Sequence, residues 1–214
     1  MCFRRVQVPS AVTADAPLLP IFLKLSGLPV LMVGGGTVAT SKLETLLSTG
    51  AAVTVVAPAI SGTIRQAGVA LVERAFVESD LEGQWLIVAA ATPEVNAAVA
   101  RAAALRHVFV NAVDDPPNAT AYLGGVVRRG SATIAISTSG RAPALAGLLR
   151  EGLDEWLPAD EALEDWFAQS DELKRRWRST GVPMAERRPE LAEAILRRYC
   201  GTLASCRKVR GDAS

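Results

Sequence analysis

A glycine-rich turn after a short apolar run is the part of this sequence with the clearest chemical use. After the apolar residues 30–33 come Gly34, Gly35, Gly36, Thr37 and Val38. Gly34, Gly36 and Ala39 match the Ala variant of the dinucleotide-binding fingerprint, whose glycines permit a tight turn and close approach of a pyrophosphate. The N–H groups of a following helix would attract that anion. Three-glycine runs also occur in flexible turns without a ligand. The neighbouring elements therefore have to distinguish a dinucleotide-binding turn from a flexible one.

Asp114 and Asp115 form a second polar group, directly after the apolar run 108–113. A carboxylate just beyond a buried strand can act as a general base or proton carrier. Acidic residues before proline are equally typical of turns. The residue types leave both interpretations open.

The loop 137–143 is a third candidate, because it carries Ser137, Thr138, Ser139, Gly140 and Arg141 ahead of a helical pattern. Hydroxyls and free helix N–H groups suit a carboxylate ligand. Ser139 acting as a helix cap explains the loop equally well. Four arginines would assist an acidic ligand, and a solvated charged surface explains them nearly as well: Arg128, Arg129, Arg141 and Arg150.

Alternating strand and helix patterns surround these loops. Strands are predicted at 30–33, 53–57, 69–72, 85–90, 108–113 and 133–137, and helices at 38–49 and 93–105. This alternation predicts an α/β fold with a doubly wound, Rossmann-like parallel sheet. Ligands of such sheets bind beyond the carboxyl ends of the strands, which here are the loops 34–38, 57–60, 91–93 and 114–118. The strand at 53–57 ends in Ala57-Pro58, without an acid or an arginine, so spacing leaves NAD versus NADP undecided.

Beyond Pro143 the pattern becomes helical, with three apolar stripes. These are Leu145, Leu148, Leu149, Leu153, Trp156 and Leu157; Leu163, Trp166 and Phe167; and Leu191, Ile195, Leu196 and Tyr199. Pro158, Gly181–Pro183 and Pro189 are expected to separate the helices. Core packing is the expected role of the stripes, with burial against a second subunit as the alternative.

Composition bounds the function. The chain has 214 residues, of which 50% are apolar and 21% charged, and its net charge is +1. This is typical of a globular protein and favours neither nucleic acid nor a membrane as partner. Cys2, Cys200 and Cys206 fit neither a disulfide framework nor a zinc site, so a cytoplasmic protein without a bound metal is expected. His107 is the single histidine, which argues against His-based acid–base chemistry.

Four segments in order resemble the precorrin-2 dehydrogenase/sirohydrochlorin ferrochelatase family, the N-terminal part of siroheme synthase and its stand-alone relatives. They are Leu19-Pro20-Ile21-Phe22 leading to residues 33–39 with Lys42; residues 89–92 with Asn96; residues 110–116; and residues 127–130 through 135–151. Together they cover roughly residues 18–157, and the combination is far more specific than the glycine motif alone.

The resemblance implies NAD⁺-dependent oxidation of precorrin-2 to sirohydrochlorin, followed by insertion of Fe²⁺ to give siroheme. It assigns the catalytic aspartate to Asp114, as a proton carrier in both reactions. It assigns the cofactor contacts to Gly34, Gly35, Gly36, Thr37, Val38, Pro58, Ala59 and Thr92. Thr138 stands where the family has a serine that faces the tetrapyrrole and is phosphorylated in some relatives. We expect the substrate to contact Asn111, Asp115, Thr138, Ser139, Gly140 and Arg141.

The same resemblance implies a homodimer that binds through the region after the nucleotide domain. We therefore expect flexible tails at 1–17 and 206–214, an NAD-binding Rossmann domain at 18–113, a dimerisation and substrate region at 114–143, and a helical domain at 144–205. The segment 118–125 matches the family only loosely, so two alternatives stay open: a dehydrogenase with a separate chelatase, and an NAD(H)-sensing module without chemistry. Iron and cobalt would use the same site.

Overall fold

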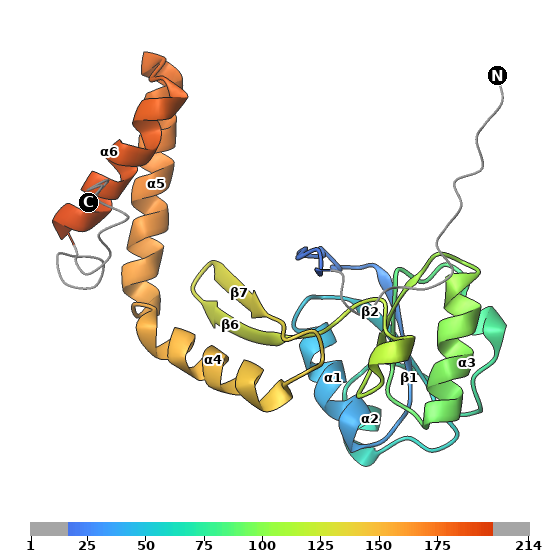
Figure 1. Cartoon of the computed structure of the whole chain (residues 1–214). Helices are drawn as coiled ribbons and strands as arrows, with labels where there is room; N and C mark the ends of the chain where they lie inside the picture. The colour runs from blue at the N-terminus through green and yellow to red at the C-terminus, as the bar shows by residue number, and fades with distance from the viewer. Residues whose placement is uncertain (1–16, 199–214) are drawn as a thin grey trace, which may run out of the picture. The chain divides into compact units, whose positions relative to one another are not determined.

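The computed structural model describes residues 17–198, which fall into two compact units that divide after Tyr122 (Figure 1). Apart from Pro17, the expected tails 1–17 and 206–214 lie outside the described residues, and so do Tyr199 and Cys200. All three cysteines are therefore outside the described part of the chain. Within the described residues, no helix is both long and apolar enough to cross a membrane.

The first unit is built on a five-stranded parallel sheet. Its strands are β1 (Pro29–Val33), β2 (Ala52–Val56), β3 (Ala70–Val72), β4 (Leu86–Ala89) and β5 (Phe109–Ala112). Their spatial order is β3-β2-β1-β4-β5, and every neighbouring pair is parallel. This confirms the predicted α/β fold. The apolar runs are continuous because β1 and β4 are covered on both faces.

Helices α1 (Thr37–Leu47) and α3 (Pro93–Ala104) pack on this sheet. The core on the α3 side includes Leu31, Ile87 and Val110. The residue pattern did not predict the short α2 (Gly62–Gln66) or the 3-10 turns η1 (Glu78–Leu81) and η2 (Pro116–Asn118). None of the three has enough residues to show a helical period.

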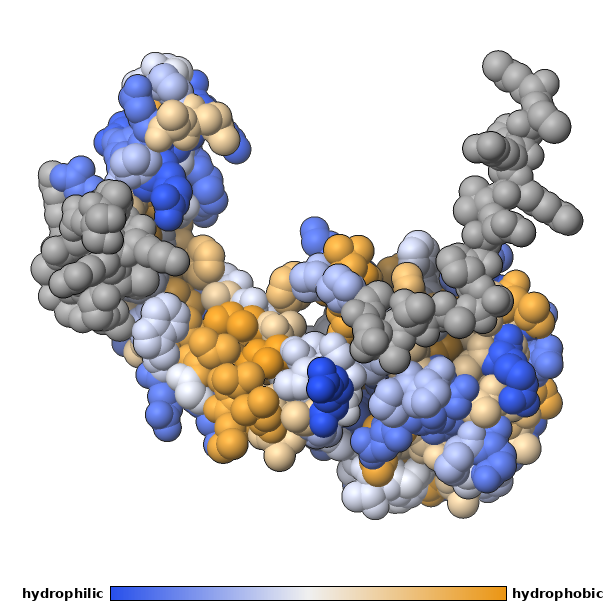
Figure 2. Space-filling view, in the orientation of Figure 1, coloured by the Kyte–Doolittle hydropathy of each residue, from blue (hydrophilic) through white to orange (hydrophobic). Residues whose placement is uncertain are grey.

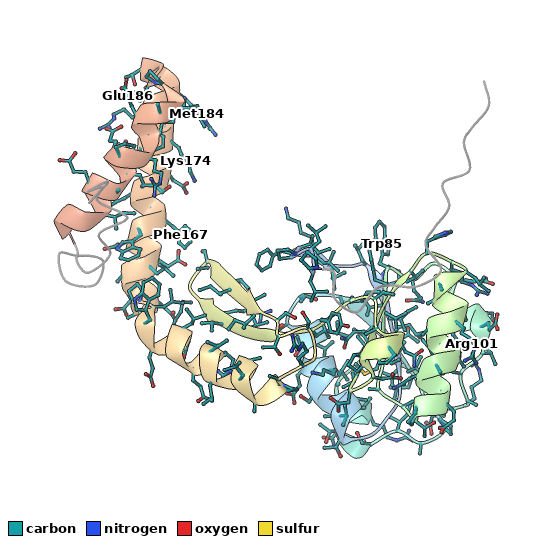
Figure 3. All side chains as sticks on the ribbon, viewed as in Figure 1. Trp85, Arg101, Phe167, Lys174, Met184 and Glu186 are labelled. Carbon is teal, nitrogen blue, oxygen red and sulfur yellow. The ribbon has the colours of Figure 1, made fainter. Side chains whose placement is uncertain are left out.

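Not every apolar residue of α1 is buried. Ala39, Leu43 and Leu46 are buried, whereas Val38 and Leu47 are exposed to 47% and 36%. The strand expected at 85–90 begins one residue later, and Trp85 points away from the unit with 62% of its surface exposed (Figure 3). Position at an element's end, rather than residue type, sets these exposures.

The second unit contains an antiparallel hairpin and three helices. The hairpin strands are β6 (Gly125–Arg129) and β7 (Ala132–Ile136), and the helices are α4 (Pro143–Trp156), α5 (Asp160–Thr180) and α6 (Met184–Arg198). The strand expected at 133–137 is therefore present but outside the parallel sheet. Residues 114–122, which the sequence analysis grouped with the following region, pack with the first unit.

Two expectations for the helices are wrong. Pro189 does not separate helices but lies inside α6, where it removes one intrahelical hydrogen bond. The apolar stripe of α4 is not core, because α4 has no buried residue. In α5, by contrast, Leu163, Leu173 and Trp177 are buried. The left-handed Gly181 (φ 71°) ends α5 as expected.

Candidate functional site

Four loops begin at one level along the carboxyl edge of the sheet. Val33 of β1 pairs with Val56 of β2 and with Ala89 of β4, and Ala89 pairs with Ala112 of β5. The order of the strands reverses between β1 and β4, which is the place where ligands of doubly wound sheets bind. The glycine turn lies at this switch point, and the Asp114 loop follows two strands further along.

The three glycines of the turn have different surroundings. A Cβ on Gly34 (φ 127°) would lie 2.2 Å from the Ala90 carbonyl oxygen, and a Cβ on Gly35 would lie 2.1 Å from that of Ala59. Both residues are therefore glycine because neighbouring backbone leaves no space. A Cβ on Gly36 would meet nothing within 4 Å. Gly36 thus leaves open surface at the start of α1.

The start of α1 is arranged as an anion cradle. Gly36 is the N-cap residue, and no side chain caps the helix. The first-turn N–H groups are therefore available to a ligand. The loop beneath is held by Thr40 Oγ1, which donates to the Gly36 carbonyl at 3.0 Å, and by the Ser61 N–H, which donates to the Gly35 carbonyl at 2.9 Å. Fixed N–H donors beside open space fit a pyrophosphate.

The loop after β4 borders the glycine turn. Thr92 is exposed and precedes α3, and its carbonyl accepts the Asn96 N–H at 2.9 Å. Asn96 is buried, and its Oδ1 accepts the Ala91 N–H at 3.1 Å. The pKa of Glu94 is below its ordinary value because the carboxylate accepts its own backbone N–H and the Thr92 hydroxyl. Asn96 and Glu94 thus shape this loop, although neither was predicted as a site residue.

The two aspartates after β5 differ in their contacts. Asp114 is exposed, adopts the left-handed φ of 56°, and its carboxylate has no hydrogen-bond or ion-pair partner among residues 17–198. Asp115 accepts the Asn118 amide at 2.9 Å, and its carbonyl accepts the Asn118 N–H at 3.1 Å. Asp115 therefore closes the turn, whereas Asp114 presents a free carboxylate. The turn interpretation is confirmed for Asp115, and the proton-carrier interpretation of Asp114 stays a prediction.

Asn111 lies beneath this loop rather than on its surface. Its side chain is buried, and Nδ2 donates to the Ala121 carbonyl at 3.0 Å. The Thr120 hydroxyl accepts the Val110 N–H at 2.8 Å. These contacts tie the segment after the loop back to β5. They make Asn111 a positioning residue, and its buried Oδ1 has no hydrogen-bond partner.

The remaining candidates lie in the second unit, in a turn between β7 and α4. Ser139 and Gly140 have positive φ values of 54° and 74°, and the Thr138 carbonyl accepts the Arg141 N–H at 3.0 Å. The Thr138 hydroxyl accepts the Ala142 N–H at 3.3 Å. Ala142, rather than Ser139, is the N-cap residue of α4, so the helix-cap alternative for Ser139 is wrong.

The described residues contain no group of three or more His, Cys, Asp or Glu side chains placed to hold a metal ion. The candidate site residues are divided between the two units. The glycine turn, Pro58, Ala59, Thr92 and the Asp114 loop belong to the first unit, and residues 138–141 belong to the second.

Comparisons with known proteins agree with the fold. Residues 21–125 match a family model described as "Putative NAD(P)-binding". Siroheme synthase 3 of Aeromonas hydrophila is 39% identical over 175 residues, which are 79% of this chain and 37% of that protein. Siroheme synthase 1 of Pectobacterium atrosepticum is 44% identical over 168 residues, which are 75% of this chain and 35% of that protein. The chain thus spans little more than a third of these relatives.

A solved structure is similar over most of the chain. It is described as SirC, precorrin-2 dehydrogenase, and it matches with a TM-score of 0.63 and 27% sequence identity. The match covers 82% of this chain and 88% of that one. It therefore extends beyond the parallel sheet into the second unit.

Proposed function

The chain belongs to the family of precorrin-2 dehydrogenases and the N-terminal part of siroheme synthases, and we propose that it oxidises precorrin-2 to sirohydrochlorin with NAD⁺. The observation that carries this proposal is the free carboxylate of Asp114 at the same sheet edge as the uncapped glycine turn. Two strand spacings, about 10 Å, separate β5 from β1. An anion cradle and a proton acceptor at this separation suit a dinucleotide-dependent oxidation.

The chain's own residues divide the binding work. The first-turn N–H groups of α1, including those of Thr37 and Val38, would hold the pyrophosphate over the open face of Gly36. Pro58 and Ala59, exposed after β2, would line the adenosine side. Thr92, exposed after β4, would line the nicotinamide side. The bound nicotinamide supplies the two-electron acceptor for the hydride.

Asp114 would handle the proton. Conversion of precorrin-2 to sirohydrochlorin removes a hydride and a proton, so NAD⁺ becomes NADH and one H⁺ is released. The Asp114 carboxylate would accept that proton, since it is exposed and engaged by no other described residue. Asp115 and Asn111 would hold the loop in place through their contacts to Asn118 and Ala121.

We further propose that the protein inserts Fe²⁺, as substrate, into sirohydrochlorin. Insertion displaces two pyrrole N–H protons, and the same carboxylate would accept them in turn. The support is the name of the relatives, siroheme synthase, together with the free Asp114. Residues 138–141 would bind the acidic macrocycle through Arg141, and two copies of the chain would form the enzyme.

The deciding experiment is an anaerobic absorbance assay with enzymatically generated precorrin-2 and NAD⁺, followed by Fe²⁺. We expect Asp114→Asn to lower the oxidation rate by roughly 10²-fold or more while NADH binding stays intact. Asn tolerates the left-handed backbone of this position, so the loop keeps its shape. Glu44→Gln, a change of the same kind on the exposed face of α1, is the control and should match the wild type.

The outcomes separate the alternatives. Oxidation without an iron-dependent spectral change above the no-enzyme rate would restrict the protein to the dehydrogenase step. Tight NAD(H) binding with no turnover of precorrin-2 would reject the enzyme and favour a sensing module.

A further inference from the structure

The adenosine end of the cradle has an unusual distribution of charge. In this fold an acid about 20 residues after the glycine turn binds the ribose 2′-hydroxyl, or a nearby arginine receives a 2′-phosphate. The corresponding residues 57–59 are Ala-Pro-Ala. Charge at this edge comes instead from Arg65 in α2 and from Glu73, the residue directly after β3.

Arg65 joins the loop after β2 to the end of β3. Its Nη1 and Nη2 donate to the two carboxylate oxygens of Glu73 at 2.5 and 2.6 Å, and its Nε donates to the Ile60 carbonyl at 3.3 Å. The Ala57 N–H donates to the Val72 carbonyl at 3.2 Å, so Glu73 follows at the level of the loop. The guanidinium therefore contacts the residue directly after Ala59, and both of its Nη groups are engaged by Glu73.

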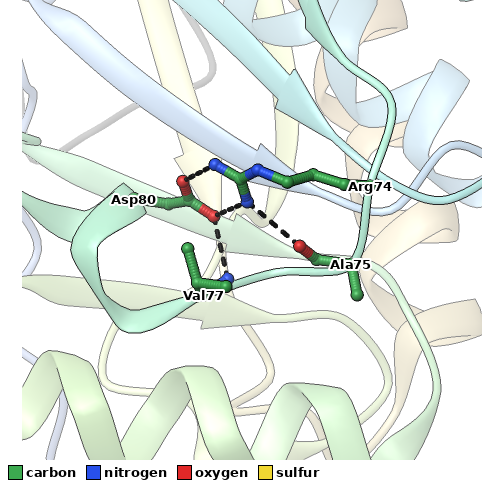
Figure 4. Close-up of polar contacts among 4 residues, drawn as sticks. All are labelled: Arg74, Ala75, Val77 and Asp80. Atoms are coloured by element: carbon green, nitrogen blue, oxygen red, sulfur yellow. Dashed lines mark hydrogen bonds and ion pairs between the residues drawn. The ribbon is translucent and has the colours of Figure 1, made fainter.

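A second arginine at this edge provides a contrast. Arg74 donates to both oxygens of Asp80 at 2.8 and 2.6 Å and to the Ala75 carbonyl at 3.0 Å, and Asp80 also accepts the Val77 N–H at 2.9 Å (Figure 4). These contacts close the loop 74–80. None of them reaches the loop after β2. Arg65–Glu73 and Arg74–Asp80 are thus both arginine–carboxylate pairs, but only Arg65–Glu73 contacts the loop after β2.

We propose that Glu73 selects the cofactor, because it occupies the fork of Arg65 and places a negative charge where the 2′-phosphate of NADP would bind. A guanidinium pairs most strongly with phosphate through two parallel hydrogen bonds. Glu73 takes both donors and repels the dianion, so NAD is favoured without any acid at the end of β2. This inference rests on the proposed dinucleotide binding and adds the residue that discriminates.

The test is a fluorescence titration of the full chain with NADH and with NADPH. Glu73→Gln removes the charge and frees Arg65, so the Kd for NADPH should fall roughly tenfold. The Kd for NADH should change by less than about threefold, as for an exposed substitution. Adding Arg65→Gln to Glu73→Gln should abolish the gain for NADPH. Glu73→Ala serves as a second variant, and circular dichroism checks that each variant is folded.

Asp80→Asn is the matched control, since it adds the same charge to the same edge by releasing Arg74. We expect it to leave the NADPH-to-NADH ratio within about threefold of the wild type. An equal gain for NADPH in this control would overturn the inference, because net charge alone would then explain the effect. An unchanged ratio in both Glu73 variants would also overturn it while leaving the proposed function intact. Failure of the wild type to bind either dinucleotide would instead reject the proposed function.

Discussion

Left-handed backbone at residues other than glycine is found at three described positions: His107, Asp114 and Ser139. His107 follows the end of α3, where such a conformation is ordinary. Asp114 and Ser139 lie in loops, and both belong to the candidate site. Left-handed backbone in a residue with a side chain costs free energy, which the surrounding hydrogen bonds must offset. At Asp114 those bonds come from the neighbours of the residue, which leaves its own carboxylate free.

Substitution of the glycines should separate folding from binding. Gly36→Ala places a methyl group in open space, so the chain should fold with nearly wild-type stability. That methyl group would occupy the approach of the pyrophosphate, and NADH affinity should fall by roughly tenfold or more. The measurement is thermal unfolding alongside NADH titration.

Gly34→Ala is the counterpart of this change. Its Cβ would lie 2.2 Å from a backbone oxygen, in a left-handed region, so the folded state should be destabilised by several kcal/mol, about 3 or more. If Gly36→Ala destabilised the chain as much as Gly34→Ala, the surface at Gly36 would not be open. That result would contradict binding of the cofactor's pyrophosphate over Gly36.

Most of the first unit could be predicted from residue patterns, because its elements are determined by residues close together in the sequence. Continuous apolar runs such as 86–89 and the glycine turn determine their own elements. The roles of Asp115 and Asn111 could not be predicted. They depend on Asn118 and on the Ala121 carbonyl, whose positions follow from how the chain returns along β5. The Arg65–Glu73 pair was missed because its partners lie on different elements that meet only after folding.

At the scale of elements, the loop between β3 and η1 owes its shape to one ion pair. The hydrogen bond from Arg74 and that from the Val77 N–H hold the pKa of Asp80 below its ordinary value. A carboxylate with a lowered pKa stabilises the folded state above its unfolded-state pKa, about 3.9, and this stabilisation is lost as the pH falls through the folded pKa. Arg74 is half exposed, which keeps the contribution modest.

Asp80→Asn should therefore destabilise the chain by about 1 kcal/mol at pH 7, and by progressively less as the pH falls below about 4. Urea unfolding of both proteins at several pH values measures the difference. A loss that is equal at pH 7 and at pH 2.5 would mean that packing of the loop, rather than the charge of Asp80, provides the stability.

The hairpin and helices of the second unit show why α4 was misjudged. Its stripe has ordinary helical spacing, and periodicity reports that a face is apolar without saying what covers it. β6 was missed because Arg128 and Arg129 interrupt its apolar pattern. Once formed, the hairpin turn is fixed by Glu164, which accepts the backbone N–H and the hydroxyl of Ser131 at 2.6 and 2.8 Å. Trp177 similarly joins α5 to α6 by donating to Glu190.

At the scale of the whole molecule, the two units differ in how much core they contain. The first unit has a continuous buried core on both faces of its sheet. Among the described residues from 123 onward, the buried hydrophobic side chains are Val127, Leu163, Leu173 and Trp177. A two-stranded hairpin is marginal by itself, and so small a core would not compensate. The apolar face of α4 is available to supply the missing burial.

That face carries Leu145, Leu148, Leu149 and Trp156, exposed to 49%, 66%, 46% and 53%. Figure 2 shows an apolar patch over α4. Apolar patches of this kind mark interfaces more often than free surface. We therefore expect a dimer in which two copies of the second unit cover each other's α4.

Leu148→Asp should disrupt this dimer, because a buried carboxylate without a partner costs several kcal/mol, about 3 or more. Light scattering coupled to gel filtration should give twice the chain mass of 22.5 kDa for the wild type and the single mass for the variant. The control is Leu105→Asp, at the end of α3 in the first unit, where an apolar side chain is 78% exposed and the dimer should persist. Because the core of the second unit is small, the monomeric variant should also unfold at lower urea concentration than the control. A wild-type chain that is monomeric at micromolar concentration would reject the dimer and leave the exposure of α4 to be explained by another partner.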